Sequence, residues 1–160
     1  STICVAIETI CDGNDNYFAY TDNGRESTGV EVVEWALRAE SLGAGEIILT
    51  SVDKDGTGEG FDLEIIKRVS NEVKIPVVAH GGAGKKEDIL NVINKASADA
   101  VAIGSLFHYS TINSIDFDFK GKKEGNFEFL NKKRKFHNHQ TVKIDSLKDF
   151  LIENNINCRR

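Results

Sequence analysis

A repeated alternation of short apolar runs and helical segments most strongly limits how this chain can fold. Four runs rich in β-branched residues are each followed by turn residues and then by apolar residues at helical spacing. This alternation is typical of parallel βα units. It predicts four strands, at residues 2–7, 46–51, 75–79 and 100–103.

Each predicted strand is followed by a predicted helix. A capping box at residues 28–31 predicts the start of the first helix. Apolar residues that recur on one helical face predict which side of each helix is buried. These residues are Val30, Val33 and Leu37; then Ile65, Ile66 and Val69; then Ile89, Leu90 and Ile93; and finally Leu147, Phe150 and Leu151.

Parallel strands with almost continuous apolar character need cover on both faces. We therefore expect helices on one face and either a closed barrel interior or a second helix layer on the other, in a single α/β domain over residues 1–160. Four strands alone would leave two sheet edges and an apolar concave face open to water. Because the chain also begins directly with an apolar strand, we expect a fragment that needs the rest of a barrel or a second copy.

Residues 110–143 interrupt the alternation, because they are rich in Lys, Asn and Phe and contain a basic run at 132–135. We interpret this region as an insertion between the fourth strand and its helix. It is either a solvated loop or hairpin, or a lid or docking surface, since loops that follow barrel strands lie on the active face.

Composition excludes several classes of partner and site. A net charge of −5 and a pI near 5.4 oppose non-specific binding to nucleic acid or to an anionic membrane. The three cysteines form no CxxC pair, and His137 and His139 lack ligands at metal-binding spacing, so neither a disulfide framework nor a metal site is expected. With no apolar run of membrane-spanning length and no leader, the prediction is a cytoplasmic protein without cofactor.

Glycine-containing loops follow the last two predicted strands. Glycine lets backbone amides approach an anion closely, and the helix after the earlier loop adds N-terminal amides that favour a phosphate. Loops after the last two strands of a barrel commonly form a phosphate site. The sequence therefore predicts a phosphate cradle, and the alternative is tight turns without a ligand. The residues concerned are Gly81, Gly82, Gly104 and Ser105.

Three motif-containing segments follow one another along the chain: GAGEIILTSVDKDGTGEGFD, IPVVAHGGAGK and ADAVAIGSLFHY. In this order they resemble the cyclase subunit of imidazole glycerol phosphate synthase, over residues 5–109 and again over 144–159. The resemblance implies the C-terminal half of a (β/α)₈ barrel, with four βα units. It also implies a lyase that uses ammonia from a glutaminase partner to form imidazole glycerol phosphate and aminoimidazole carboxamide ribotide from a substrate with two phosphates.

The resemblance also assigns residues. One catalytic aspartate of the family lies outside this chain, and the other falls on Glu8, whose longer side chain moves the carboxylate about 1.5 Å. A misplacement of about 1 Å can lower a rate roughly a hundredfold. The chain by itself is expected to be inactive, because it lacks one aspartate and one phosphate site. The resemblance implies that the phosphate site present in this chain consists of Asp55, Gly56, Gly81, Gly82, Gly104 and Ser105. It places Thr50 near the reacting centre.

Three further residues have open interpretations. His80 stands where the family has a small residue, and it either gives a phosphate a charge-assisted hydrogen bond or simply packs at the strand end. Glu46 begins the second strand, where the resemblance implies a charged ring that admits ammonia; the alternative is a surface residue. His108 follows an apolar run and is expected to be structural.

Two alternatives to the cyclase remain. The full-length protein could be an ammonia-conduit subunit of a surface-sugar amidation system, a role that Glu46, the altered Glu8 and the long insertion would suit. It could instead be a phosphoribosyl isomerase of the same pathway, which is also built from two half-barrels. The stretch GAGEIILTSVDKDG favours the cyclase.

Overall fold

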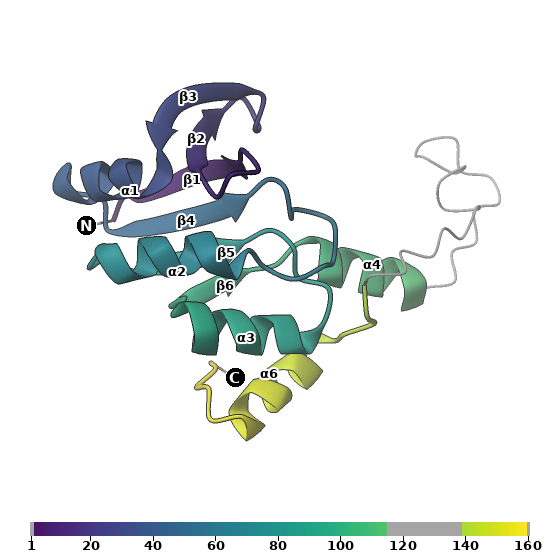
Figure 1. The fold of residues 1–160 in the computed structure, drawn as a ribbon. Coiled ribbons are helices and arrows are strands. Elements are labelled where there is room, and N and C mark those ends of the chain that lie inside the picture. Colours follow the sequence, from purple (N-terminus) through teal and green to yellow (C-terminus); the bar gives the residue numbers. More distant parts are fainter. Residues whose placement is uncertain (1, 115–138, 160) are drawn as a thin grey trace.

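The computed structural model describes residues 2–114 and 139–159 (Figure 1). Within these ranges the chain forms six strands and five helices, and no helix among them is long and apolar enough to cross a bilayer. In chain order they are β1 (Cys4–Cys11), β2 (Tyr17–Thr21), β3 (Glu26–Glu31), α1 (Val32–Ser41), β4 (Glu46–Ser51), α2 (Leu63–Glu72), β5 (Val77–His80), α3 (Lys86–Ala96), β6 (Ala100–Ala102), α4 (Ser105–Ser114) and α6 (Ile144–Glu153).

The six strands form one sheet in the order β3-β2-β1-β4-β5-β6. The strands β1, β4, β5 and β6 are parallel to their neighbours, whereas β2 pairs antiparallel with β1, and β3 antiparallel with β2. Helices α1, α2 and α3 connect the parallel strands, which confirms the α/β prediction of a partial (β/α)₈ barrel.

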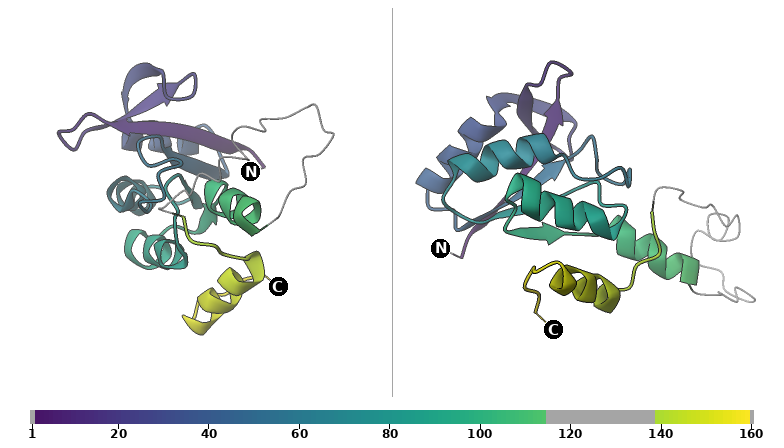
Figure 2. Two further views of the ribbon diagram at one scale, coloured as in Figure 1. Left: turned by 90° about the vertical axis from the view of Figure 1, so that its right-hand side faces the viewer. Right: turned by 60° about the horizontal axis from the view of Figure 1, so that its bottom comes forward.

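Strand alternation gives the sheet two different faces. On one face the side chains are buried under α1, α2 and α3, which lie side by side along it (Figure 2). These buried residues include Ile7, Ile47, Leu49, Val77 and Ala79. On the other face the side chains are more accessible; Ala6 is exposed, and Ile48 and Val78 are half-buried. The concave barrel face predicted from the sequence is therefore uncovered among the described residues.

The register of the parallel strands lines up one row of residues near their carboxyl ends. Glu8 pairs with Thr50, Thr50 with His80, and His80 with Ala102. Because residues in register on parallel strands point to the same face, the side chains of this row all lie on the accessible face. We call the end of the sheet at which these strands finish the carboxyl edge.

The region before α1 differs from the prediction. The capping box at residues 28–31 was wrong, because residues 26–31 form β3, the second arm of an antiparallel hairpin. The Thr28 hydroxyl donates to the backbone carbonyl of Ala19 on β2 instead of capping a helix. The helix begins at Val32, where the Glu31 carboxylate accepts a hydrogen bond from the Glu34 amide at 2.9 Å.

The buried side of α1 also differs from the prediction. Leu37 is 40% exposed, whereas Val32, Ala36 and Ala39 face the core. In the other helices, the predicted apolar residues do pack inward: Ile65, Ile66 and Val69 of α2, Ile89 of α3, and Leu147 and Leu151 of α6 are buried.

Helix α4 follows β6 directly and continues to Ser114, so the first residues of the predicted insertion, 110–114, are helical. Residues 115–138, which include the basic run 132–135 and His137, lie outside the described residues. Residues 139–143, here called the strap, pack against α4 and against the loop between β5 and α3. The Ser110 hydroxyl bonds both the N–H and the carbonyl of Val142 at 2.9 Å, and the Gln140 amide donates to the Gly84 carbonyl at 2.8 Å.

Candidate functional site

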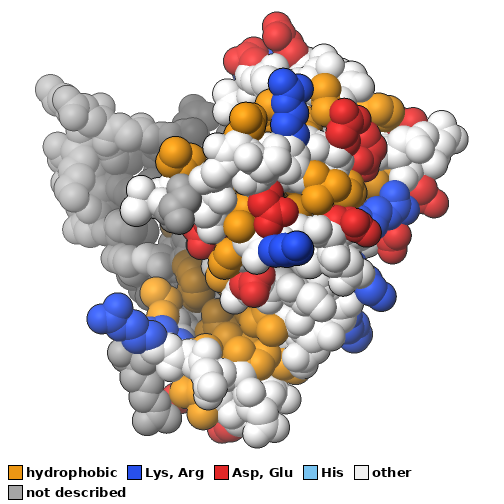
Figure 3. Space-filling view, turned by 90° about the vertical axis from the view of Figure 1, so that its left-hand side faces the viewer, with side chains coloured by type: hydrophobic (Ala, Val, Ile, Leu, Met, Phe, Trp, Pro, Cys, Tyr) orange, Lys and Arg blue, Asp and Glu red, His pale blue; other side chains and the backbone are white. Residues whose placement is uncertain are grey.

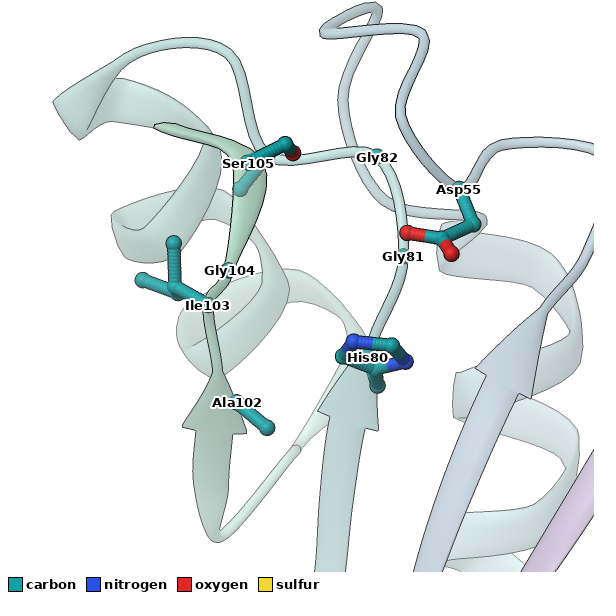
Figure 4. Close-up of a pocket in the computed structure, with 9 residues that line it drawn as sticks. Asp55, His80, Gly81, Gly82, Ala102, Ile103, Gly104 and Ser105 are labelled. Atoms are coloured by element: carbon teal, nitrogen blue, oxygen red, sulfur yellow. The ribbon is translucent and has the colours of Figure 1, made fainter. Parts of the chain in front are cut away.

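A small hollow lies at the carboxyl edge, where the loops after β4, β5 and β6 meet (Figure 4). The hollow is shallow and opens to solvent, and its enclosed space is far smaller than the roughly 300–1,000 Å³ of a pocket that encloses a whole ligand. It has room for at most one small group of a ligand. It is lined by Asp55, His80, Gly81, Gly82, Ala83, Ala102, Ile103, Gly104 and Ser105.

Two glycines of the β5–α3 loop are required by close backbone packing. Gly81 and Gly82 have φ values of +91° and +108°. A Cβ on Gly81 would lie 2.6 Å from the Ser51 carbonyl oxygen, and one on Gly82 would overlap the Gly60 carbonyl. The Gly60 amide donates to the Gly82 carbonyl at 2.8 Å. Packing between two loops thus explains these glycines without a ligand.

Gly104 is different, because an added Cβ would meet no atom within 4 Å. Neither a positive φ nor a close neighbour requires glycine at this position. The residue lines the hollow directly before α4 (Figure 4). Open space beside a glycine at this place is what a bound group would use.

Asp88 of α3 holds the β5–α3 loop in shape. This buried carboxylate accepts hydrogen bonds from the amides of Gly84 at 2.9 Å and Lys85 at 3.0 Å. These two amides therefore have a partner within the protein. An anion in the hollow would depend on other donors, namely the amides earlier in the loop and those that begin α4.

The start of α4 supplies donors on the opposite side of the hollow. Ser105 is the first residue of the helix, and the first N–H groups of a helix have no partner within it. The positive end of the helix dipole adds to their attraction for an anion. The Ser105 hydroxyl extends toward the loop of Gly82 (Figure 4). The hollow thus offers backbone and hydroxyl hydrogen-bond donors on two walls, and an anion would accept from both.

Beside the hollow, the row of residues at the carboxyl edge contains a direct side-chain contact. Thr50 Oγ1 lies 3.0 Å from His80 Nδ1. Glu8 is half-buried next to Thr50 on the same face. The Asp53 carboxylate accepts a hydrogen bond from the Cys11 amide at 2.8 Å, which fixes the β4–α2 loop against the end of β1. A carboxylate, a hydroxyl and an imidazole therefore stand in line across three strands.

The structure brings most of the predicted site together. Five of the six predicted phosphate residues line the hollow, namely Asp55, Gly81, Gly82, Gly104 and Ser105. Gly56 is not among the lining residues; it follows Asp55 in the loop with a φ of +75°.

Glu46 lies far from the hollow, at the amino end of β4 and in register with Cys4 of β1. Partial desolvation, and then the hydrogen bond and charge of Glu46, raise the pKa of the Cys4 thiol. His108 is exposed on α4, edge-on to Tyr109. Among the residues that the structure describes, no three His, Cys, Asp or Glu side chains are grouped so as to hold a metal ion.

Several residues that shape the site were missed from the sequence. Asp88 stands three residues after Lys85, which is the spacing of a helix-capping carboxylate, so its role could have been recognised. The contact between Gly60 and Gly82 joins two separate loops, and no local pattern indicates it. Ala102 and Ile103 line the hollow only because β6 ends beside β5.

Comparisons of the sequence with a family model and with curated proteins point to the same family. The family described as "Histidine biosynthesis protein" matches residues 1–113. Curated relatives are named imidazole glycerol phosphate synthase subunit HisF. The chain is 50% identical over 107 residues to that of Dehalococcoides mccartyi strain BAV1, 54% over 105 residues to that of Bifidobacterium longum strain DJO10A, and 48% over 116 residues to that of Lactococcus lactis subsp. cremoris.

The matches cover different shares of the two sequences. They include 67%, 66% and 71% of this chain, but only 42%, 41% and 45% of the three relatives. The chain therefore spans less than half the length of the curated relatives that it matches. The matched residues contain all of β1 to β6, the row at the carboxyl edge and the hollow.

Proposed function

Because this chain belongs to the histidine biosynthesis protein family, we propose that the full-length protein is the cyclase subunit of imidazole glycerol phosphate synthase, a lyase. It would convert a ribonucleotide with two phosphates into imidazole glycerol phosphate and aminoimidazole carboxamide ribotide. The three free cysteines fit a reducing cytoplasm as the place of this reaction.

The observation that carries the proposal is the hollow beside the row of Glu8, Thr50 and His80. One phosphate of the substrate would bind in the hollow, held by loop amides and by the start of α4. This anchor would place the adjoining part of the substrate over the row, because the hollow and the row share His80. Binding and chemistry would therefore be neighbours at the carboxyl edge, where barrel enzymes have their active sites.

Glu8 would be the general acid–base group that this chain contributes. It lies at the end of β1 on the accessible face, next to Thr50. A carboxylate there can take a proton from the substrate and return it, provided that it comes within hydrogen-bond distance, about 2.6–3.2 Å, of the proton's carrier. Thr50 would orient the reacting part of the substrate through its hydroxyl.

A glutaminase would dock at the opposite end of the sheet and deliver ammonia past Glu46. Figure 3 views the molecule from the side at which the chain enters β1, where apolar and acidic side chains are interspersed. Two large apolar residues are exposed near the amino ends of β1 and β4, Ile3 at 61% and Leu42 at 75%. Exposed apolar side chains around a carboxylate suit a protein partner better than solvent does.

The direct test is turnover by the full-length protein with ammonium salts as the nitrogen source, so that no glutaminase is needed. Formation of imidazole glycerol phosphate is expected, and Glu8→Gln is expected to lower it by about 10²–10⁴-fold. Glu8→Asp, which keeps the charge, is the matched control and should turn over at least as fast as the natural sequence.

An absence of turnover together with intact phosphate binding would instead favour an ammonia-conduit subunit. That alternative predicts that the protein still stimulates a glutaminase and that substitution of Glu46 changes this stimulation. A phosphoribosyl isomerase would convert the precursor aldose into the ketose without any ammonia, which the same assay detects.

A further inference from the structure

The hollow proposed to hold a phosphate has an unusual charge balance. Of its nine lining residues, His80 is the one whose side chain can carry a positive charge, and Asp55 carries a negative one. The two side chains lie on the same side of the hollow (Figure 4). Asp55 would therefore repel an anion, and His80 is the side chain in the lining that can offset this repulsion with a positive charge.

The imidazole of His80 has one nitrogen committed and one available. Nδ1 lies 3.0 Å from Thr50 Oγ1. Nε2 has no hydrogen-bond partner among the residues that the structure describes, and the ring lines the hollow. One side chain thus touches both the hydroxyl of the row and the space for the anion.

The protonation state of the ring decides what both contacts can be. A neutral imidazole has one N–H and one acceptor nitrogen. If Nδ1 accepts, the Thr50 hydroxyl uses its one hydrogen on the ring; if Nδ1 donates, Nε2 presents a lone pair toward the anion. The imidazolium alone donates from both nitrogens, so it binds the anion and leaves the Thr50 hydrogen free for the substrate.

We propose that His80 is the cationic anchor of the bound phosphate and, through Nδ1, the positioning residue that turns the Thr50 hydroxyl toward the substrate. This inference rests on the proposed function, because it assumes that the hollow binds an anion. It assigns His80 a role in binding and in alignment, separate from the acid–base role of Glu8.

The groups near His80 are either uncharged or acidic. Its register neighbours are Thr50 on β4 and Ala102 on β6, neither of which is charged. Asp55 from the β4–α2 loop shares the hollow, and Glu8 stands beyond Thr50 in the row. A protonated imidazole attracts an anion more strongly than a neutral one does, so anion binding should strengthen as the pH falls.

Sulfate is a suitable probe, because it has the shape of phosphate but keeps its charge between pH 5.5 and pH 8. The protein is titrated with sulfate at both pH values and at constant ionic strength. A charge-assisted hydrogen bond exceeds a neutral one by enough to make the dissociation constant about tenfold lower at pH 5.5. His80→Asn keeps a polar atom near the place of Nδ1 but carries no charge, so its affinity should stay at the weaker value at both pH values.

His108→Asn is the matched control, because it removes an exposed imidazole of α4 that is not among the lining residues. It should keep the tenfold dependence. His80→Gln serves as a second neutral variant if His80→Asn does not fold. Equal sulfate affinity at both pH values in the natural sequence would overturn the role of His80 while leaving the hollow as an anion site. No sulfate binding at either pH would overturn the hollow itself, and with it both proposals.

Discussion

Thr50 is the residue through which binding and chemistry would be connected, since it stands between Glu8 and His80 in the row and bonds His80 directly. Its side chain is half-buried at the carboxyl edge. The hydroxyl has one hydrogen and two lone pairs, so it can bond His80 and a substrate atom at once. Its contribution should therefore lie in alignment rather than in affinity for the phosphate.

Thr50→Val tests this assignment, because valine keeps the shape and loses the hydroxyl. We expect turnover to fall by about 10–100-fold, as for a misaligned reacting group, while sulfate affinity at pH 5.5 stays within about twofold. Thr50→Ser restores the hydroxyl and should recover most of the rate. Steady-state kinetics and sulfate titration on the same samples check both parts. An unchanged rate in Thr50→Val would remove Thr50 from the reacting centre.

Two glycines at the hollow are expected to serve different purposes: Gly81 is needed for folding, and Gly104 for binding. Gly81→Ala would force a Cβ to within 2.6 Å of the Ser51 carbonyl at a φ of +91°, and should lower the free energy of unfolding by about 1–3 kcal/mol. Gly104→Ala meets no atom within 4 Å, so stability should change by no more than about 0.5 kcal/mol.

Gly104→Ala should nevertheless weaken sulfate binding at least fivefold, because its methyl group would occupy space needed by the anion. Denaturant unfolding and sulfate titration measure the two effects independently. If Gly104→Ala binds sulfate as well as the natural sequence does, the open space at Gly104 has no role in binding.

At the scale of elements, the strap 139–143 ties α4 to the loop that shapes the hollow. Ser110 holds Val142 through two hydrogen bonds, and Gln140 holds the carbonyl of Gly84. His139 packs edge-on against Tyr109 with the ring centroids 5.0 Å apart. Neither ring nitrogen of His139 has a hydrogen-bond partner among the described residues. A protonated ring would fit poorly there.

Desolvation lowers the pKa of His139 below its usual value. The folded state therefore binds fewer protons than the unfolded state, and stability is lost as the pH falls through about 6.5, the ordinary value for histidine. We expect the Tm to fall more between pH 7.5 and pH 5 in the natural sequence than in His139→Phe, which keeps the ring contact without titrating. Parallel slopes of Tm against pH in the two proteins would mean that His139 does not titrate in this range.

The elements also show what local sequence can and cannot predict. The strand at 46–51 was predicted with its observed bounds, because a short continuous apolar run follows a glycine-containing turn and is followed by further turn residues. The hairpin of β2 and β3 was missed, because β3 contains Glu, Ser, Thr and Gly and is exposed over most of its length. Its strand conformation comes from pairing with β2, which is a tertiary effect.

For the whole molecule, the sequence predicted the kind of fold and most of the residues that line the hollow, but not the contacts that shape it. The glycine-containing loops at the hollow follow from glycine spacing and strand order. The alignment of Glu8, Thr50 and His80 follows from the register between strands, and the shape of the loop follows from Asp88 and Gly60. Register and loop-to-loop packing depend on the assembled sheet, so a single sequence does not reveal them.

The whole molecule also presents an accessible sheet face, with the site at one end and Glu46 at the other. The row lies at the carboxyl edge, and the amino edge carries Glu46 and the exposed Ile3. Parallel strands therefore place anion binding and the proposed entry of ammonia at opposite ends of one sheet.

The most direct test of the anion site proposed at the hollow is an amide NMR titration of the protein with glycerol phosphate. If the hollow binds the phosphate, saturable shifts are expected for the amide signals of Gly82, Ala83, Gly104 and Ser105, which line it. The amides of Gly84 and Lys85, already bonded to Asp88, should shift much less. Shifts confined to residues away from the carboxyl edge, or no saturable shift at all, would show that the hollow is not an anion site.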